Sequence, residues 1–253
     1  MSTRKVRLDE LLCERELAGS LREATALILS GAVLVNGEKV DKAGILVAKE
    51  ASLQVRTNAH PYVSRGGLKL KAALDHFGVS ARDKVVIDVG ASTGGFTDCL
   101  LQEGAKKVYA VDVGYGQLAW SLRKDPRVVV VERTNIRQFD PTGIIDAPPD
   151  MAVIDVSFIS LRRVIPPVLN IIKAGGYIIA LVKPQFEAPK NRVEKGGVIK
   201  DPAVREETIK GIINFCTTKG IKIKGVCPSP ISGSAGNWEV FIYGIWEREE
   251  NGR

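Results

Sequence analysis

The segment VVIDVGASTGGF, residues 85–96, constrains most strongly what this chain can fold into. Its apolar run ends at Asp88, a glycine-dense turn follows, and apolar residues then recur at helical spacing. This order predicts a strand, a tight loop and a helix whose free N–H groups face a small ligand. Gly90 and Gly95 match the outer positions of the dinucleotide fingerprint, but Ser92 occupies the middle one, where a pyrophosphate needs bare backbone. We therefore expect a nucleoside ligand that lacks a pyrophosphate.

The rest of the chain extends this pattern into an α/β fold. Strand-like runs alternate with helical stretches after residue 85, which predicts a doubly wound, Rossmann-like parallel sheet. The last two extended runs, residues 222–230 and 237–246, follow each other directly and predict an antiparallel edge. In such sheets ligands bind beyond the carboxyl ends of the strands.

Composition sets wide limits on function. A length of 253 residues, 45% of them hydrophobic, suffices for a full core and a small second domain. The formal net charge of +7 is compatible with a polyanionic partner. The cysteines show no C-x-x-C spacing, no apolar signal region follows the N-terminal charges, and no apolar run approaches the ~18–20 residues of a membrane-spanning helix. We expect a reduced cytoplasmic protein that has no membrane partner and requires no metal.

The first 57 residues predict a compact module of two helices and a small sheet. Three leucines at helical spacing mark the first helix, and Ser20 with Glu23 forms a capping box at the start of the second. Asn36-Gly37 between alternating apolar residues predicts a hairpin.

We divide the chain into a domain at residues 1–57, a linker at 58–63 and a second domain at 64–253. The segment TNAHPYV, residues 57–63, contains that linker and has linker composition. Ser64 is the expected cap of the helix that carries Lys69.

The N-terminal module resembles the S4-like RNA-binding domain. The string RLDELLCERELAGSLREATALILSGAVLVNGEKV carries this resemblance, which covers about residues 5–57. It implies an α+β module that contacts structured RNA through Arg7, Arg22 and Lys39. An ordinary solvated surface accounts for these three side chains equally well.

Charged residues converge where the strands of the second domain end. Asp88, Asp112, Asp155 and Lys183 each close a strand-like run. An acidic residue about 20 positions beyond a glycine loop typically accepts hydrogen bonds from ribose hydroxyls, and we expect that role for Asp112. The alternative is an ordinary carboxylate at the end of a strand. A nucleoside cofactor without a pyrophosphate in this fold is most simply S-adenosylmethionine. We expect it to contact Asp88, Gly90, Ser92, Gly94, Gly95, Phe96, Asp112 and Asp155.

Five motifs of the chain resemble those of the haemolysin A family. They are DVGASTGGFTDCLL, AVDVGYGQL, IDVSFIS, ALVKPQFE and GNWEVF, and the resemblance as a whole covers almost the entire chain. The family joins an S4-like domain to an FtsJ-like methyltransferase sheet of class I. The resemblance implies 2′-O-methylation of cytidine in ribosomal RNA, either as free RNA or in ribosomal subunits. It also implies a catalytic set formed by Lys69, Asp155, Lys183 and Glu239.

The chemistry of ribose methylation agrees with a lysine in that set. A 2′-hydroxyl must lose its proton as it attacks a sulfonium methyl group, which requires a base or a strong electrostatic stabiliser. Burial and a second cation favour the neutral amine of a lysine, and Lys69 can be that cation for Lys183. The segment between Lys183 and Lys200 is either a solvated loop or a clamp that holds RNA through Lys190 and Arg192.

Two other functions are compatible with parts of the sequence. A non-catalytic RNA-binding or ribosome-assembly factor needs the N-terminal module and only a vestigial cofactor site. A membrane-lysing protein needs a spanning helix, a barrel or a strongly amphipathic face, and the sequence contains no evident one.

Overall fold

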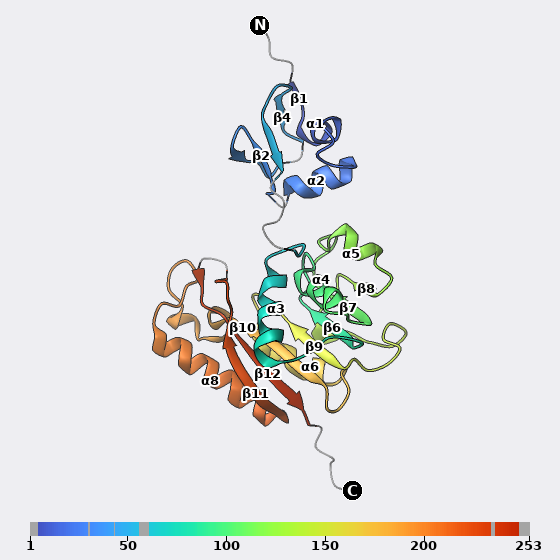
Figure 1. Ribbon diagram of the computed structural model, residues 1–253. Coiled ribbons are helices and arrows are strands. Elements are labelled where there is room, and N and C mark those ends of the chain that lie inside the picture. The colour runs from blue at the N-terminus through green and yellow to red at the C-terminus, as the bar shows by residue number, and fades with distance from the viewer. Residues whose placement is uncertain (1–4, 30, 43, 56–60, 234–235, 248–253) are drawn as a thin grey trace. The chain divides into compact units, whose positions relative to one another are not determined.

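The computed structural model describes residues 5–29, 31–42, 44–55, 61–233 and 236–247. The chain divides into two compact units, Met1–Pro61 and Tyr62–Arg253 (Figure 1). Residues 58–60 of the expected linker lie outside the described residues. Among the described residues, no helix combines the length and the apolar character that crossing a membrane requires.

The first unit packs two helices against short strands. Its elements are β1 (Lys5–Arg7), α1 (Leu8–Glu14), α2 (Leu21–Leu29), β2 (Val33–Val35), β3 (Glu38–Lys39), β4 (Leu46–Ala48) and β5 (Leu53–Val55). The Ser20 cap is confirmed, because Glu23 N donates to Ser20 Oγ at 3.2 Å. The reciprocal bond is shifted by one residue, since Glu23 Oε2 accepts from Gly19 N at 2.8 Å. The Asn36-Gly37 hairpin is also confirmed, since both residues have positive φ and β2 pairs antiparallel with β3 around them.

The second unit is built on a seven-stranded sheet in the described part of the chain. Its strands are β6 (Val85–Val89), β7 (Lys107–Val111), β8 (Val128–Val131), β9 (Met151–Ile154), β10 (Tyr177–Val182), β11 (Ile221–Pro228) and β12 (Val240–Trp246). The order across the sheet is β11-β12-β10-β9-β6-β7-β8. The strands from β10 to β8 run parallel, whereas β12 is antiparallel to both of its neighbours. The predicted fold class and the antiparallel edge are therefore confirmed.

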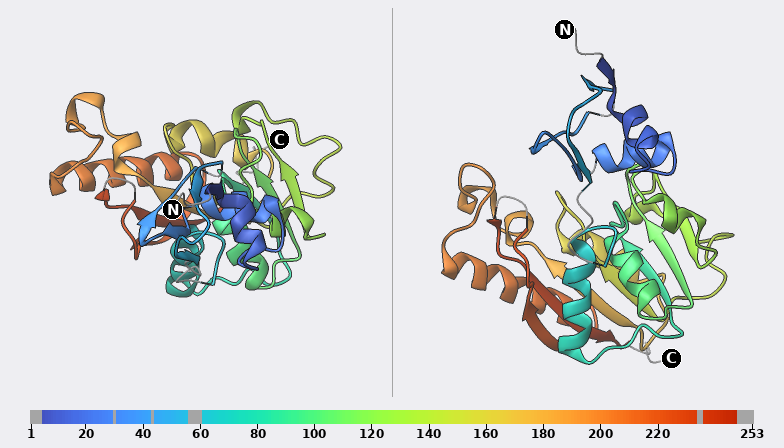
Figure 2. Two further views of the ribbon diagram at one scale, coloured as in Figure 1. Left: turned by 90° about the horizontal axis from the view of Figure 1, so that it is seen from above. Right: turned by 45° about the horizontal axis from the view of Figure 1, so that its top comes forward.

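Helices cover both faces of this sheet (Figure 1, Figure 2). They are α3 (Gly66–Phe77), α4 (Gly95–Gln102), α5 (Trp120–Lys124), α6 (Leu161–Leu169), α7 (Pro184–Glu187) and α8 (Pro202–Thr218), with short 3-10 turns η1 (Ile136–Gln138) and η2 (Lys190–Arg192). Apolar residues of α3, α4 and α5 pack on one face, and those of α6 and α8 pack on the other. The central strands are consequently buried on both faces, which explains their continuous apolar runs.

The start of the second unit is packed against its core. Tyr62 lies within the expected linker, yet it is 6% exposed and belongs to the core cluster that includes α3 and α4. Its ring covers Gly67, where an added Cβ would lie 2.2 Å from Tyr62 Cγ. Val63 N donates to Asp98 Oδ2 of α4 at 2.7 Å. The linker is thus shorter at this end than the composition of the segment indicates.

We predict that Gly67→Ala destabilises the second unit by about 1–3 kcal/mol, because Tyr62 must leave its packed position. Gly66→Ala is the matched control in the same helix. A Cβ at Gly66 meets its nearest neighbour, Ser64 Oγ, at an ordinary 3.4 Å, so alanine there should be neutral or slightly stabilising. Urea unfolding of both variants measures the difference. Equal free energies of unfolding for the two variants would contradict this account of Tyr62.

Candidate active site

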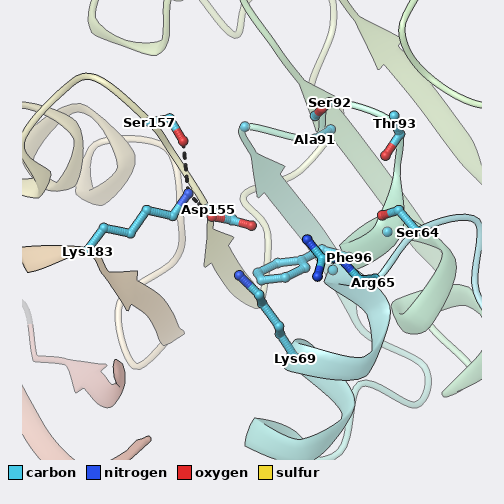
Figure 3. A pocket seen from close by; sticks show the side chains of 13 residues that line it. Ser64, Arg65, Lys69, Ala91, Ser92, Thr93, Phe96, Asp155, Ser157 and Lys183 are labelled. Carbon is cyan, nitrogen blue, oxygen red and sulfur yellow. Dashed lines mark hydrogen bonds and ion pairs between the residues drawn. The ribbon is translucent and has the colours of Figure 1, made fainter. Parts of the chain in front are cut away.

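A cavity of about 310 Å³ lies at the carboxyl ends of the parallel strands. It is lined by Ser64, Arg65, Gly66, Lys69, Gly90, Ala91, Ser92, Thr93, Gly95, Phe96, Asp155, Ser157 and Lys183. Figure 3 shows Lys183 reaching Asp155 and Ser157 on one side of this cavity, with Lys69 and Phe96 on the other. Side chains that are far apart in the sequence therefore meet in one place.

Lys183 is held by two groups of the loop that follows β9. Its Nζ lies 2.6 Å from Asp155 Oδ1 and donates to Ser157 Oγ at 2.9 Å. The side chain of Lys183 is 11% exposed and that of Asp155 is 22% exposed. Strands β9 and β10 pair in parallel, so the residues that follow them leave the sheet on the same edge. This pairing explains why two predicted strand-end charges meet.

Lys69 forms a second ion pair with Glu239. Lys69 Nζ lies 2.6 Å from Glu239 Oε2, and the two side chains are 12% and 2% exposed. Because β12 is antiparallel, its first residue, Val240, stands opposite Val182 at the end of β10. Glu239 therefore enters the sheet beside Lys183, and the four expected catalytic residues form two lysine–carboxylate pairs. Each lysine faces its own carboxylate.

The glycine loop contacts Asp112 on one strand end and the backbone of Asp155 on another. Ser92 N donates to Asp112 Oδ2 at 2.8 Å, and Gly114 N donates to Asp112 Oδ1 at 2.7 Å. A carboxylate has about four acceptor positions, so Asp112 keeps capacity for further donors such as ribose hydroxyls. Gly90 has φ +89°, and a Cβ on it would lie 2.4 Å from the Asp155 carbonyl oxygen. A side chain at this position would clash with the Asp155 backbone, so glycine is needed here whether or not a ligand is bound.

The expected cofactor residues divide into two groups. Gly90, Ser92, Gly95, Phe96 and Asp155 line the cavity, whereas Asp88, Gly94 and Asp112 do not. Gly94 packs against α5 instead, where a Cβ would lie 2.3 Å from Leu122 Cδ1.

Asp88 corrects our expectation that its side chain contacts the cofactor. Its carboxyl group is wholly buried and accepts a hydrogen bond from Thr97 Oγ1 at 2.6 Å. Burial raises the pKa of Asp88 to about 7. The group therefore joins β6 to α4, the two elements between which the glycine loop runs.

Ser64 also differs from the expectation. Helix α3 begins at Gly66 after Arg65, and no side chain caps its first turn. Ser64 instead lines the cavity together with the exposed Arg65, for which no sequence pattern indicates a role. A polar residue two positions before a helix has the signature of a cap, and only the turn at this point shows that it faces the site.

An exposed aromatic ring stands next to the cavity and was also missed. Phe158 follows the lining residue Ser157, has φ +63° and is 90% exposed. Its ring centroid lies 5.0 Å from that of Phe186. Exposed aromatic rings are surfaces on which nucleic-acid bases stack. A lone phenylalanine in an apolar stretch gives no sequence signal for such a position.

The five expected RNA contacts lie on the surface in both units. Arg22 and Lys39 are exposed in the first unit, and Lys190 and Arg192 are exposed in the second. Arg7 is half-exposed, and its guanidinium forms an ion pair with Asp9 at 2.6 Å, which lowers the pKa of Asp9. Its side chain is therefore already held by a carboxylate of its own unit.

The cavity fits a nucleoside bearing an amino-acid tail. Its volume of about 310 Å³ falls at the small end of the range of ligand sites, about 300–1,000 Å³. Asp112 beside the loop suits a ribose, the ring of Phe96 gives an apolar wall, and Arg65 supplies a cation for a carboxylate. These residues fit S-adenosylmethionine.

Two protein families match this chain. Residues 62–245 match the FtsJ-like methyltransferase family, and residues 6–53 match the S4 domain. The two matched ranges correspond to the two compact units of the structure.

Named relatives are similar over nearly the full chain. A Bacillus subtilis protein provisionally named rRNA methyltransferase YqxC is 49% identical over 98% of this chain and 89% of its own length. The 16S/23S rRNA (cytidine-2′-O)-methyltransferase TlyA of Mycobacterium tuberculosis is 43% identical over 99% of this chain and 92% of its own. A solved structure from Streptococcus thermophilus, provisionally described as a hemolysin, is 40% identical with a TM-score of 0.75, covering 98% of this chain and 90% of its own.

The buried Asp88 carboxyl generates a pH prediction. An unfolded aspartate titrates near pH 4, so between about pH 4 and 7 the folded state binds the extra proton and stability falls as the pH rises. Asp88→Asn removes this titration. Relative to the variant, the parent should lose about 1 kcal/mol of unfolding free energy per pH unit, as measured by urea unfolding at pH 5, 6 and 7. A difference between the two proteins that is constant with pH would contradict the raised pKa.

Proposed function

The chain belongs to the FtsJ-like methyltransferase family and carries an S4 domain, and from this premise we propose that it is an S-adenosylmethionine-dependent 2′-O-methyltransferase of ribosomal RNA. We further propose cytidine ribose as the acceptor. The specificity that the Mycobacterium tuberculosis relative carries in its name supports this choice. Ribosomal RNA or ribosomal subunits are then the partners, and the cytoplasm is the compartment in which the reaction takes place.

The observation that carries the proposal is the pair of lysine–carboxylate contacts at one cavity. Lys183 with Asp155 and Lys69 with Glu239 are each separated by 2.6 Å, and all four side chains are at least three-quarters buried. Charges are removed from water at a cost unless they are paired, so such an arrangement is typical of a reaction site. A protein that only binds RNA has no need of it, which disfavours the alternative of a non-catalytic assembly factor.

Each residue of the site has a different role in methyl transfer. When bound, the cofactor supplies a methyl group on a sulfonium. The Lys183 ammonium of the ion pair first releases a proton to solvent, and its Nζ then accepts the proton of the 2′-hydroxyl. Asp155 and Ser157 fix the position of that amine, and the Asp155 carboxylate stabilises the ammonium ion that forms. The Lys69 ammonium, paired with Glu239, stabilises the negative charge that develops on the ribose oxygen.

RNA binding is assigned to surfaces outside the cavity. We propose that the first unit docks on folded RNA through Arg7, Arg22 and Lys39. Lys190 and Arg192, on the segment that follows Lys183, contact the phosphates near the acceptor. Phosphate contacts of this kind supply affinity and orientation rather than base specificity. The net charge of +7 supports such a role.

The proposal predicts that Lys183→Met slows methyl transfer by about 10²–10⁴-fold, because methionine keeps the apolar stem and removes the amine. Cofactor affinity should change little. Single-turnover rates with saturating RNA and cofactor measure the effect. Lys173→Met is the matched control, since Lys173 also forms an ion pair, 2.5 Å from Asp150, but lies at the amino ends of the strands.

A transfer rate for Lys183→Met within about threefold of the parent, far below the usual effect of removing a general base, would rule out Lys183 as the base. Equal losses in Lys183→Met and Lys173→Met would show that the effect is a general one of removing an ion pair.

A further inference from the structure

Glu187 connects the two loops that carry the proposed catalytic pair. It is the last residue of α7, the single turn that directly follows Lys183. Its Oε2 accepts a hydrogen bond from Ser160 Oγ at 2.5 Å, and its Oε1 accepts one from Leu161 N at 2.7 Å. Ser160 is the N-cap of α6, at the end of the loop that begins at Asp155. One carboxylate therefore joins the segment after β10 to the segment after β9.

The two loops touch at three successive places. Lys183 contacts Asp155 and Ser157 nearest the sheet, Phe158 packs on Phe186 in the middle, and Glu187 bonds the start of α6 at the far end. The turn between the outer contacts is itself rigid. Phe186 N donates to Lys183 O at 2.9 Å, and Pro184 restricts the backbone of Lys183 to an extended conformation.

The chemistry of the contact suits a carboxylate. The first turn of a helix has free N–H donors and the positive end of the helix dipole, and Glu187 satisfies one of those donors on α6. Both of its oxygens are used, and its side chain is half-buried between the loops. Removing it leaves Ser160 and Leu161 without this partner and releases the far end of the Lys183 turn.

We propose that Glu187 is a positioning residue for methyl transfer: by fixing α7 to the N-terminus of α6, it holds Lys183 against Asp155. This inference rests on the proposed function of Lys183 as the base. Glu187 does not touch the substrate, so its effect is on the rate of the chemical step rather than on binding. Misplacing a catalytic group by about 1 Å can cost on the order of 10²-fold in rate.

The test compares three variants of the full chain. Glu187→Ala removes both contacts, whereas Glu187→Gln keeps an acceptor for Leu161 N and an amide that donates to Ser160 Oγ. Asp150→Ala is the matched control, because Asp150 also joins two segments but lies at the amino ends of the strands. Its carboxylate accepts a hydrogen bond from Val85 N at 2.8 Å and pairs with Lys173 at 2.5 Å. We measure single-turnover methyl transfer, cofactor affinity, RNA affinity and the unfolding midpoint of each protein.

A second readout does not depend on activity. Brief acetylation with acetic anhydride, followed by peptide mass spectrometry, reports how firmly Lys183 Nζ is held, with Lys69 as the internal reference. The expected result for Glu187→Ala is a transfer rate lower by about 10- to 100-fold, affinities within about threefold of the parent, and several-fold faster labelling of Lys183 relative to Lys69. Glu187→Gln and Asp150→Ala should keep both the rate and the labelling of the parent.

Two results overturn the inference. One is a Glu187→Ala protein with parental rate and parental Lys183 labelling. The other is a loss of rate in Asp150→Ala equal to that in Glu187→Ala at the same unfolding midpoint, which assigns the effect to stability. A parent protein that transfers no methyl group, while Lys183 labelling still rises in Glu187→Ala, refutes the proposed function and leaves the positioning contact standing.

Discussion

The parallel pairing of β6 with β9 is the constraint on which the rest of the site depends. Val89 stands opposite Ile154 in this register, so Gly90 and Asp155 leave the sheet side by side. The two backbones are so close that a Cβ on Gly90 would lie 2.4 Å from the Asp155 carbonyl oxygen. The loop that lines one part of the cavity and the carboxylate that holds Lys183 are therefore fixed to each other. Packing of this kind fixes reacting groups before any ligand binds. Groups that are already in place need no rearrangement during the reaction, which lowers the activation barrier.

The electrostatic design of the site follows from the same geometry. Lys69, Lys183 and Asp155 line the cavity, and each lysine has its own carboxylate partner at 2.6 Å. Pairing holds the amines in place and offsets the cost of burying them. It also cancels their positive potential at a distance, so the attraction of a polyanion must come from other side chains. Exposed cations such as Arg65, Lys190 and Arg192 are suited to that role.

Much of this architecture could be predicted from the sequence because strand ends in a parallel sheet meet at one edge. Asp155 and Lys183 close apolar runs, and their meeting follows from topology alone. Lys69 and Glu239 are 170 residues apart, and only a family resemblance suggested that they belong together. The missing information was the antiparallel insertion of β12 beside β10, which no local pattern encodes.

Side-chain direction was the other quantity that the sequence did not determine. Asp88 is a carboxylate near a strand end, as expected of a ligand contact, but its side chain points into the core. The reason is that Asp88 is the penultimate residue of a strand buried on both faces. Ser64 resembles a helix cap but lines the cavity. Phe158 resembles a core residue and is 90% exposed because its backbone adopts a left-handed conformation. For Ser64 and Phe158 a single backbone turn decides which way the side chain points, and for Asp88 its place in the buried strand does.

The function that we propose for this chain is transfer of a methyl group to the 2′-oxygen of a cytidine in ribosomal RNA. The most direct measurement incubates the protein with ribosomal RNA or ribosomal subunits and S-adenosylmethionine carrying a deuterated methyl group. The RNA is then digested to nucleosides, and fragmentation in the mass spectrometer separates the base from the ribose. The account predicts labelled cytidine whose label stays with the ribose. Label on a base, or RNA that carries no label, would contradict it.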